Sequence, residues 1–185
     1  RGGSSPTNPG EDQASSRIRV WSRPIGRPTS ERRAVWDSGD VDGAATRAVR
    51  YAGDPLEPFA VYDWQVDSTS TRGTVTRGES WFETGALDDA DWRGAAWIAA
   101  SEVAPTGPSG ATPVPRLSRE FEIDRPIAAA RLFVAAGGYA FASINGRPVS
   151  DDVLSPGFTD YTDRVLWVAD DVTDLLAPGA NRIDI

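Results

Sequence analysis

The sequence predicts an all-β protein built from two β-sandwich modules in tandem. Three observations predict it: apolar and polar residues alternate in short runs, turn-forming residues separate these runs, and no helical period is sustained over three turns. Short strands with this punctuation are typical of sandwiches. Residues 1–15 hold Gly, Ser, Pro and acidic residues without apolar periodicity, so we expect a flexible lead-in there.

The first module is predicted over residues 16–87. Its clearest strand is 61–66, where Tyr62, Trp64 and Val66 share one face. The other strands expected in this module are short, at 18–20, 34–36, 48–51 and 81–84.

Leu56, Pro58 and Tyr62 have the Leu-x-Pro-x-x-x-Tyr spacing of a tyrosine corner. In that motif the phenol hydroxyl forms a hydrogen bond with upstream backbone, and the ring fills one end of the sandwich. With Trp64 following, the pattern predicts a fibronectin type III-like module. These residues are therefore interpreted as structural.

The second module is predicted over residues 91–185, after an acidic connector at 88–92. A loop is expected at 101–115 and a single helical turn at 172–176. Gly137-Gly138 and Asn145-Gly146 are typical two-residue hairpin turns, because both positions of each accept a positive φ. The strands expected in this module lie at 117–123, 129–136, 139–144, 164–168 and 181–185.

Composition excludes several classes of function. The net charge of −8 disfavours nucleic acid as a partner, and no apolar run approaches the roughly 18–20 residues that cross a bilayer. The absence of Cys excludes disulfides, zinc–thiolate sites and thiol nucleophiles, and the absence of His excludes histidine-based triads. All 19 basic residues are Arg, a bias that favours a bacterial source and leaves the compartment, cytoplasmic or secreted, unknown.

Short motifs follow one another from 16 to 185, each of which is weak alone. In the first half these are 36–39 (WDSG), 51–56 (YAGDPL) and 82–85 (FETG). In the second half they are 92–98 (WRGAAWI), 117–121 (LSREF), 144–149 (INGRPV), 154–161 (LSPGFTDY), Arg164, 171–176 (DVTDLL) and 179–181 (GAN). In their order and spacing, the motifs of the second half resemble the N-terminal β-sandwich of bacterial α-L-rhamnosidases of glycoside hydrolase family 78, and those of the first half resemble the module before it.

The resemblance implies a parent enzyme that removes terminal α-L-rhamnose with inversion, on an (α/α)6 barrel downstream. Inversion uses two carboxyl groups about 6.5–9.5 Å apart, and nothing in this chain matches the region that carries them. We therefore expect no catalytic residue here, an inactive chain, and a piece of a longer protein whose partners are its own catalytic domain and rhamnosylated glycosides.

Candidate sugar-binding residues are the aromatic side chains Phe158, Tyr161 and Trp167. Phe158 and Tyr161 are expected to be half-buried, and Asn145 and Gly146 to be structural. The acidic clusters at 88–91, 151–152 and 170–174 are expected on solvated turns, with Asp171 and Thr173 capping the short turn after them. No metal site is predicted, although calcium is the one metal that these oxygens suit, and some related modules bind rhamnose through calcium.

Two alternatives remain open beside an accessory region: a stand-alone carbohydrate-binding module and a structural or adhesion module. Exposed rings at Phe158, Tyr161 or Trp167 would favour the carbohydrate-binding module, and buried rings would favour the accessory region. Because 181–185 alternates polar and apolar residues up to the last position, we also expect a strand that has barely begun, leaving the second sandwich truncated with an open edge.

Overall fold

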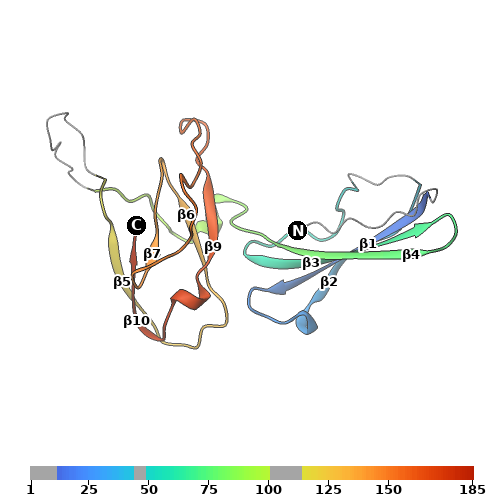
Figure 1. The fold of residues 1–185 in the computed structure, drawn as a ribbon, viewed down its shortest axis with the longest axis horizontal. Helices are drawn as coiled ribbons and strands as arrows, with labels where there is room; N and C mark the ends of the chain where they lie inside the picture. The colour runs from blue at the N-terminus through green and yellow to red at the C-terminus, as the bar shows by residue number, and fades with distance from the viewer. Residues whose placement is uncertain (1–11, 44–48, 101–113) are drawn as a thin grey trace. The chain divides into compact units, whose positions relative to one another are not determined.

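The computed structural model describes residues 12–43, 49–100 and 114–185, so most of the predicted lead-in and of the loop at 101–115 lies outside the described residues. The chain forms two compact units that divide between Asp91 and Trp92. Both are built from antiparallel strands (Figure 1), and the described residues contain no α-helix. The predicted all-β class is confirmed.

The first unit contains one sheet of four long antiparallel strands in the order β2-β1-β3-β4. A 3-10 helix, η1 (Thr29–Glu31), connects the first two. β1 begins three residues before the predicted start of the module. The strands are β1 (Gln13–Pro24), β2 (Arg33–Asp42), β3 (Ala60–Ser70) and β4 (Val75–Glu83).

The core of this unit lies on one face of the sheet. Val20, Ala60 and Tyr62 are buried there, and Trp36, Tyr51 and Leu56 are among the half-buried side chains that pack on them. Tyr51 and Leu56 come from the loop between β2 and β3. Within the described residues, this loop rather than a second sheet covers the core.

The strand expected at 48–51 is wrong for its described part, residues 49–51, which lie in an irregular loop. Tyr51 instead packs edge-on against Trp36, with ring centroids 5.1 Å apart, and donates a hydrogen bond to the Asp54 carbonyl at 2.7 Å. Gly53 allows this approach, since a Cβ there would lie 2.6 Å from Trp36 Cβ and from the Val35 carbonyl oxygen. Packing on β2 therefore replaces strand pairing.

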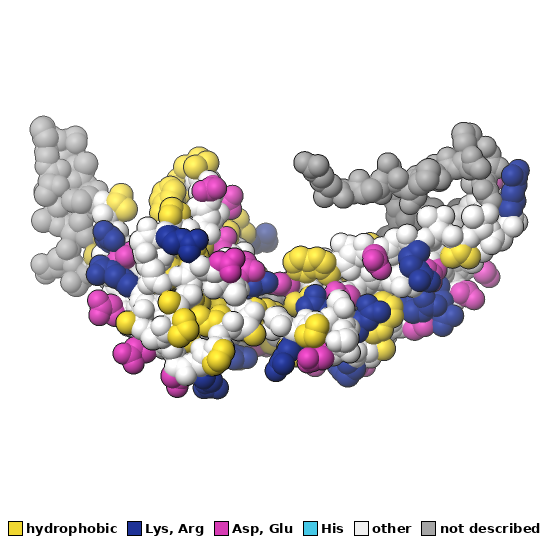
Figure 2. All heavy atoms as spheres, turned by 60° about the horizontal axis from the view of Figure 1, so that its bottom comes forward, with side chains coloured by type: hydrophobic (Ala, Val, Ile, Leu, Met, Phe, Trp, Pro, Cys, Tyr) yellow, Lys and Arg dark blue, Asp and Glu magenta, His cyan; other side chains and the backbone are white. Residues whose placement is uncertain are grey.

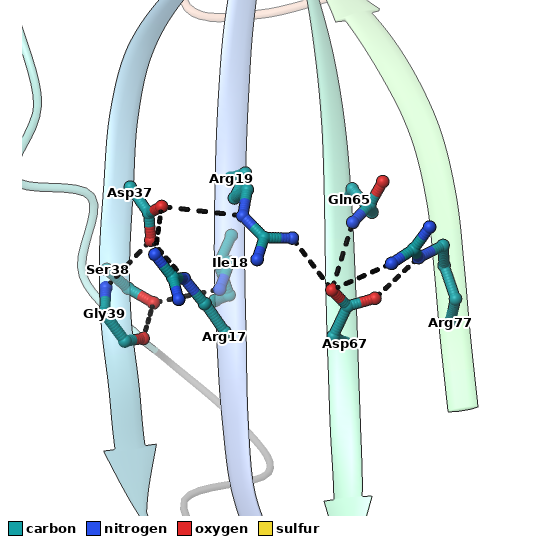
Figure 3. A network of polar contacts seen from close by, with 9 residues as sticks. All are labelled: Arg17, Ile18, Arg19, Asp37, Ser38, Gly39, Gln65, Asp67 and Arg77. Carbon is teal, nitrogen blue, oxygen red and sulfur yellow. Dashed lines mark hydrogen bonds and ion pairs between the residues drawn. The ribbon is translucent and has the colours of Figure 1, made fainter. Parts of the chain in front are cut away.

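The opposite face of the sheet carries a continuous polar network (Figure 3). Arg17 makes a two-pronged contact with Asp37 at 2.7 and 2.8 Å, and Arg19 lies between Asp37 and Asp67. Asp67 also accepts from Arg77 Nε at 2.6 Å. The hydrogen bond from Arg17 is the main cause that lowers the pKa of Asp37 to about 2. The hydrogen bond from Arg77 does the same for Asp67, whose pKa is also lowered to about 2. The network joins all four strands.

The second unit has short strands in two sheets, one of four strands in the order β5-β10-β7-β8 and one pairing β6 with β9. Two 3-10 helices, η2 (Asp89–Trp92) and η3 (Thr173–Leu175), lie at its start and before β10. The strands are β5 (Ser118–Ile123), β6 (Arg131–Ala135), β7 (Ser143–Ile144), β8 (Arg147–Pro148), β9 (Trp167–Asp171) and β10 (Gly179–Asp184).

Asn145-Gly146 forms the two-residue turn of the β7–β8 hairpin, with φ of 51° and 77°. Both positive values fit the type I′ turn that twisted strands prefer. Asn145 Nδ2 donates to the Leu175 carbonyl and to Asn181 Oδ1, and its Oδ1 accepts from the Arg182 N–H. The turn therefore anchors β10 as well as closing a hairpin.

The hairpin expected at Gly137-Gly138 is wrong. The strand before it, β6, pairs with β9, whereas the strand after it, β7, pairs with β10 and β8. The two glycines therefore carry the chain from one sheet to the other. A glycine pair permits a tight turn, but the choice of strand partner depends on which faces are buried.

The strand expected to have barely begun at 181–185 is instead β10, which runs over the six residues Gly179–Asp184. The expected truncation of the second sandwich, with its open edge, stays a prediction. β10 is an interior strand: it pairs with β5 from Gly179 to Asp184 on one side and with β7 at Ile183 and Asp184 on the other. Ile185 exchanges two backbone hydrogen bonds with Leu117, at 2.8 and 2.9 Å. Alternation identified the strand, but could not show that both of its sides are paired.

Candidate functional site

A pocket of about 230 Å³ opens on the second unit. Val134 of β6 and Val168 of β9, which are paired across the small sheet, form part of its apolar wall. Residues of β7, β8 and the segments next to them complete it, among them Ser143, Pro148 and Phe141. The pocket exists because the strands around it are short and give way to loops.

Backbone hydrogen bonds join two segments that line the pocket, residues 140–142 and 149–155. The Ala140 N–H donates to the Ser155 carbonyl at 2.9 Å, and the Val149 N–H donates to the Ala142 carbonyl at 3.0 Å. The peptide bond between Ser155 and Pro156 is cis, and Pro156 is fully buried. The loop from 149 to 156 is therefore held against the segment before β7.

Two carboxylates, Asp152 and Asp170, line the pocket. Burial, reinforced by the charge of Asp152, raises the pKa of Asp170 above its ordinary value. Asp170 shares a face of β9 with Val168, so this acidic side chain points to the apolar side of its strand. Desolvation and the nearby carboxylate both disfavour the ionised form of Asp170.

Exposed aromatic side chains surround the pocket region. Phe141 lines the pocket and is 67% exposed, and Tyr139, two residues before it, is also exposed. In Figure 2, hydrophobic side chains (yellow) gather over this end of the second unit.

The three predicted sugar-binding residues are not brought together into one site. Phe158 and Tyr161 form an edge-on pair, with centroids 5.3 Å apart. Trp167 packs edge-on against Phe133 and Trp92, at 5.5 and 6.3 Å. None of the three lines the pocket. The expectation of a half-buried Phe158 is wrong, since it is 74% exposed, whereas Tyr161 is half-buried.

Asp152, Asp170 and Phe141 are the site residues that sequence reasoning missed. The two acids were assigned to solvated turns because each has an acidic neighbour. The alternation of the strand could have identified Asp170. Within 167–171, Val168 and Asp170 are two residues apart and share one face, which places a carboxylate beside an apolar side chain.

The other acidic clusters serve turns. Asp88 Oδ1 accepts from the N–H groups of Ala90 and Asp91, and Asp91 Oδ2 accepts from those of Leu87 and Asp88. Asp171 Oδ1 accepts from the N–H and the hydroxyl of Thr173 at the start of η3. In the described parts of the chain, no three Asp or Glu side chains gather closely enough to hold a metal ion.

The residues assigned structural roles lie in the core of the first unit and at the β7–β8 turn. Tyr62 is 1% exposed, its Oη accepts from the Glu57 N–H at 2.7 Å, and its ring stacks on Phe82. Thr84 Oγ1 fixes the same corner by donating to the Glu57 carbonyl and accepting from the Ala60 N–H. Leu56 and Trp64 pack against the buried cluster, and Pro58 lies in the turn before β3.

Two family models match the chain in sequence order. Residues 4–88 match the Rha78A-like N-terminal immunoglobulin domain, and residues 125–185 match the α-L-rhamnosidase N-terminal domain. The chain belongs to the N-terminal region of the α-L-rhamnosidase family. An immunoglobulin domain stands where the sequence predicted the related fibronectin type III-like module.

Individual relatives agree with the family models. An α-L-rhamnosidase of Formosa agariphila is 34% identical over 165 residues, which are 82% of this chain and 17% of the relative. The solved structure of an α-L-rhamnosidase from Dictyoglumus thermophilum superposes on 96% of this chain and 21% of its own, with a TM-score of 0.75 and 28% identity. The solved structure of an α-L-rhamnosidase from Aspergillus terreus superposes with a TM-score of 0.73 and 25% identity. The superposition covers 96% of this chain and 20% of the Aspergillus chain. The chain thus spans about a fifth of these α-L-rhamnosidases.

None of the helices in the described residues has the length and apolar character needed to span a bilayer.

Proposed function

We propose that this chain is a non-catalytic accessory region of an α-L-rhamnosidase that removes terminal α-L-rhamnose from glycosides. The observation that carries the proposal is the order of the two N-terminal family domains, which together account for most of the chain. The chain itself covers only about a fifth of the length of its relatives. In this proposal the catalytic barrel lies elsewhere in the protein, and the rhamnosylated glycoside is its substrate. The accessory region supports or orients that barrel.

The direct test is hydrolysis of an aryl α-L-rhamnoside by the purified chain. We expect no turnover, because the acid and base of the reaction belong to the barrel. Asp152 and Asp170 are two carboxyl groups that line the same pocket, so Asp170→Asn is the variant that tests whether any turnover arises there. Turnover that disappears in Asp170→Asn would place the chemistry in this chain and overturn the proposal.

A second test uses a rhamnosidase that carries this region at its N-terminus. Removing the residues that correspond to 12–185 should leave the barrel's acid and base in place while lowering its stability or substrate affinity. An enzyme whose melting temperature, kcat and KM are all unchanged by the deletion would show that the region neither supports nor orients the barrel.

Carbohydrate binding is the second candidate, and two observations favour it: Phe141, which lines the pocket, is exposed, and so is Phe158, which does not line it. The pocket is smaller than the roughly 300–1,000 Å³ of drug-sized sites, which limits an occupant to one small ring. We expect L-rhamnose to bind no more tightly than about 1 mM, because few polar groups converge there. Micromolar, calcium-dependent binding in calorimetry, lost in Phe141→Ala and Asp170→Asn, would instead make carbohydrate binding the principal function.

A further inference from the structure

Among the described residues, β4 forms one edge of the sheet in the first unit, and its only strand partner there is β3. The Thr84 N–H donates to the Ala60 carbonyl, and the Ser70 N–H donates to the Thr74 carbonyl. Because hydrogen-bonded pairs alternate along an antiparallel ladder, the even-numbered residues of β4 bond to β3. The backbone N–H and C=O groups of Val75, Arg77, Glu79 and Trp81 therefore point outward from the sheet.

This edge is regular and apolar at its ends. The β3–β4 register runs without a shift from Thr69–Val75 to Val61–Glu83, whereas β2, at the other edge, pairs with β1 through two register shifts. Val75 and Trp81 are each 58% exposed. The strand has no Pro and no bulge, two of the features that prevent an edge from pairing, and its charged residues Arg77 and Glu79 have opposite signs.

Charge alternates in sign from strand to strand on the face that carries these side chains. Asp37 lies on β2, Arg17 and Arg19 on β1, Asp67 on β3 and Arg77 on β4 (Figure 3). Each of these Arg side chains contacts an Asp side chain on the adjacent strand. A fifth strand beside β4 would continue this alternation if it placed an acidic residue opposite Arg77.

We propose that β4 pairs antiparallel with β4 of a second copy of this chain, about a two-fold axis at Gly78. In this register Arg77 lies opposite Glu79 of the second copy, and by symmetry Glu79 lies opposite its Arg77. Val75 lies opposite Trp81 on the same face. The paired residues are the odd-numbered ones, whose backbone groups already point outward, so the two sheets join into one of eight strands.

Charge also rejects the neighbouring registers. A shift that keeps odd residues opposite odd residues sets either Arg77 against Arg77 or Glu79 against Glu79, and like charges directly opposite are destabilising. A shift by one residue would set the outward-pointing backbone groups opposite residues whose own backbone groups already bond to β3, and would turn every apolar residue of the second copy to the other face. Among these neighbouring registers, the one about Gly78 alone satisfies both the backbone and the side chains.

The test is sedimentation of residues 1–185 across a concentration series. Wild type should dimerise. Glu79→Arg should raise the dissociation constant of the dimer by about tenfold or more, because the two-fold symmetry places Arg opposite Arg at two positions. Asp163→Arg, which makes the same charge change on an exposed loop of the second unit, should leave the dimer unchanged. Thermal melts establish that each variant is folded.

Mixing two variants tests the register itself. Arg77→Glu alone should also dimerise poorly, but an equimolar mixture with Glu79→Arg sets Arg against Glu at every charged position and should form a heterodimer. A wild-type chain that stays monomeric, a Glu79→Arg dimer as tight as wild type, or a mixture without heterodimer would each overturn the proposal.

Discussion

In their described residues, the two units build antiparallel sheets in opposite ways. The first uses four strands of nine to twelve residues and joins them on the outer face through Arg–Asp contacts. The second uses strands of two to six residues and ties its loops with side-chain amides and carboxylates, above all Asn145, Asn181 and Asp171. Long strands leave a flat surface and a free edge, whereas short strands leave room for a pocket.

This difference separates the possible roles of the units. The described pocket, its perturbed acid and the exposed aromatic residues belong to the second unit. The first unit offers an ordered edge suited to another strand. Mutations should therefore affect the units through different mechanisms, and calorimetry that separates their unfolding transitions should show it.

The largest expected effect is that of Asn181→Ala in the second unit. Asn181 is 3% exposed, its Nδ2 donates to the Ala177 and Gly179 carbonyls, and its Oδ1 accepts from the Ala177 N–H and from Asn145. Alanine leaves these groups unpaired, so the free energy of unfolding should fall by about 2–4 kcal/mol. Glu122→Ala, at an exposed position of β5, is the control and should change little.

Tyr62→Phe in the first unit should cost about 1–3 kcal/mol, because it removes the buried hydroxyl that accepts from the Glu57 N–H. Tyr51→Phe removes a hydrogen bond of the same length, 2.7 Å, at a half-buried side chain, and should cost less. Chemical denaturation measures both. Equal losses for the two variants would show that burial does not set the importance of the tyrosine corner.

The first unit should lose stability in acid. The pKa values of Asp37 and Asp67 are lowered to about 2 in the folded chain, so the unfolded chain binds protons first as the pH falls. Their contribution is complete above pH 4 or so and is lost between about pH 4 and 2. Asp67→Asn should flatten the pH dependence of the first unit's melting temperature in this range while leaving that of the second unit unchanged.

The smallest expected effect has the opposite sign. The raised pKa of Asp170 means that its ionised form is disfavoured in the folded chain, so Asp170 lowers stability once the pH exceeds that pKa. Asp170→Asn should therefore raise the melting temperature of the second unit slightly at pH 7 and lose this advantage in acid. A lower melting temperature at pH 7 would show that the carboxylate is stabilising.

The sequence by itself determined the all-β class, the strand at 61–66, the hairpin turn at Asn145-Gly146 and the resemblance to α-L-rhamnosidases. These follow from local rules: alternation fixes a strand's two faces, and a positive φ at two adjacent residues selects Asn-Gly. The Leu-x-Pro-x-x-x-Tyr spacing is local too, since Tyr62 and its donor Glu57 are five residues apart.

The tertiary structure alone decided the strand partners, the covering of the core and the pocket. Gly137-Gly138 permits a change of direction in either topology, and only the pairing of β6 with β9 and of β7 with β10 separates the two. Asp152 and Asp170 are 18 positions apart in the sequence and line the same pocket, together with Pro156. Such contacts depend on the free energy of packing the whole unit, which no local pattern encodes.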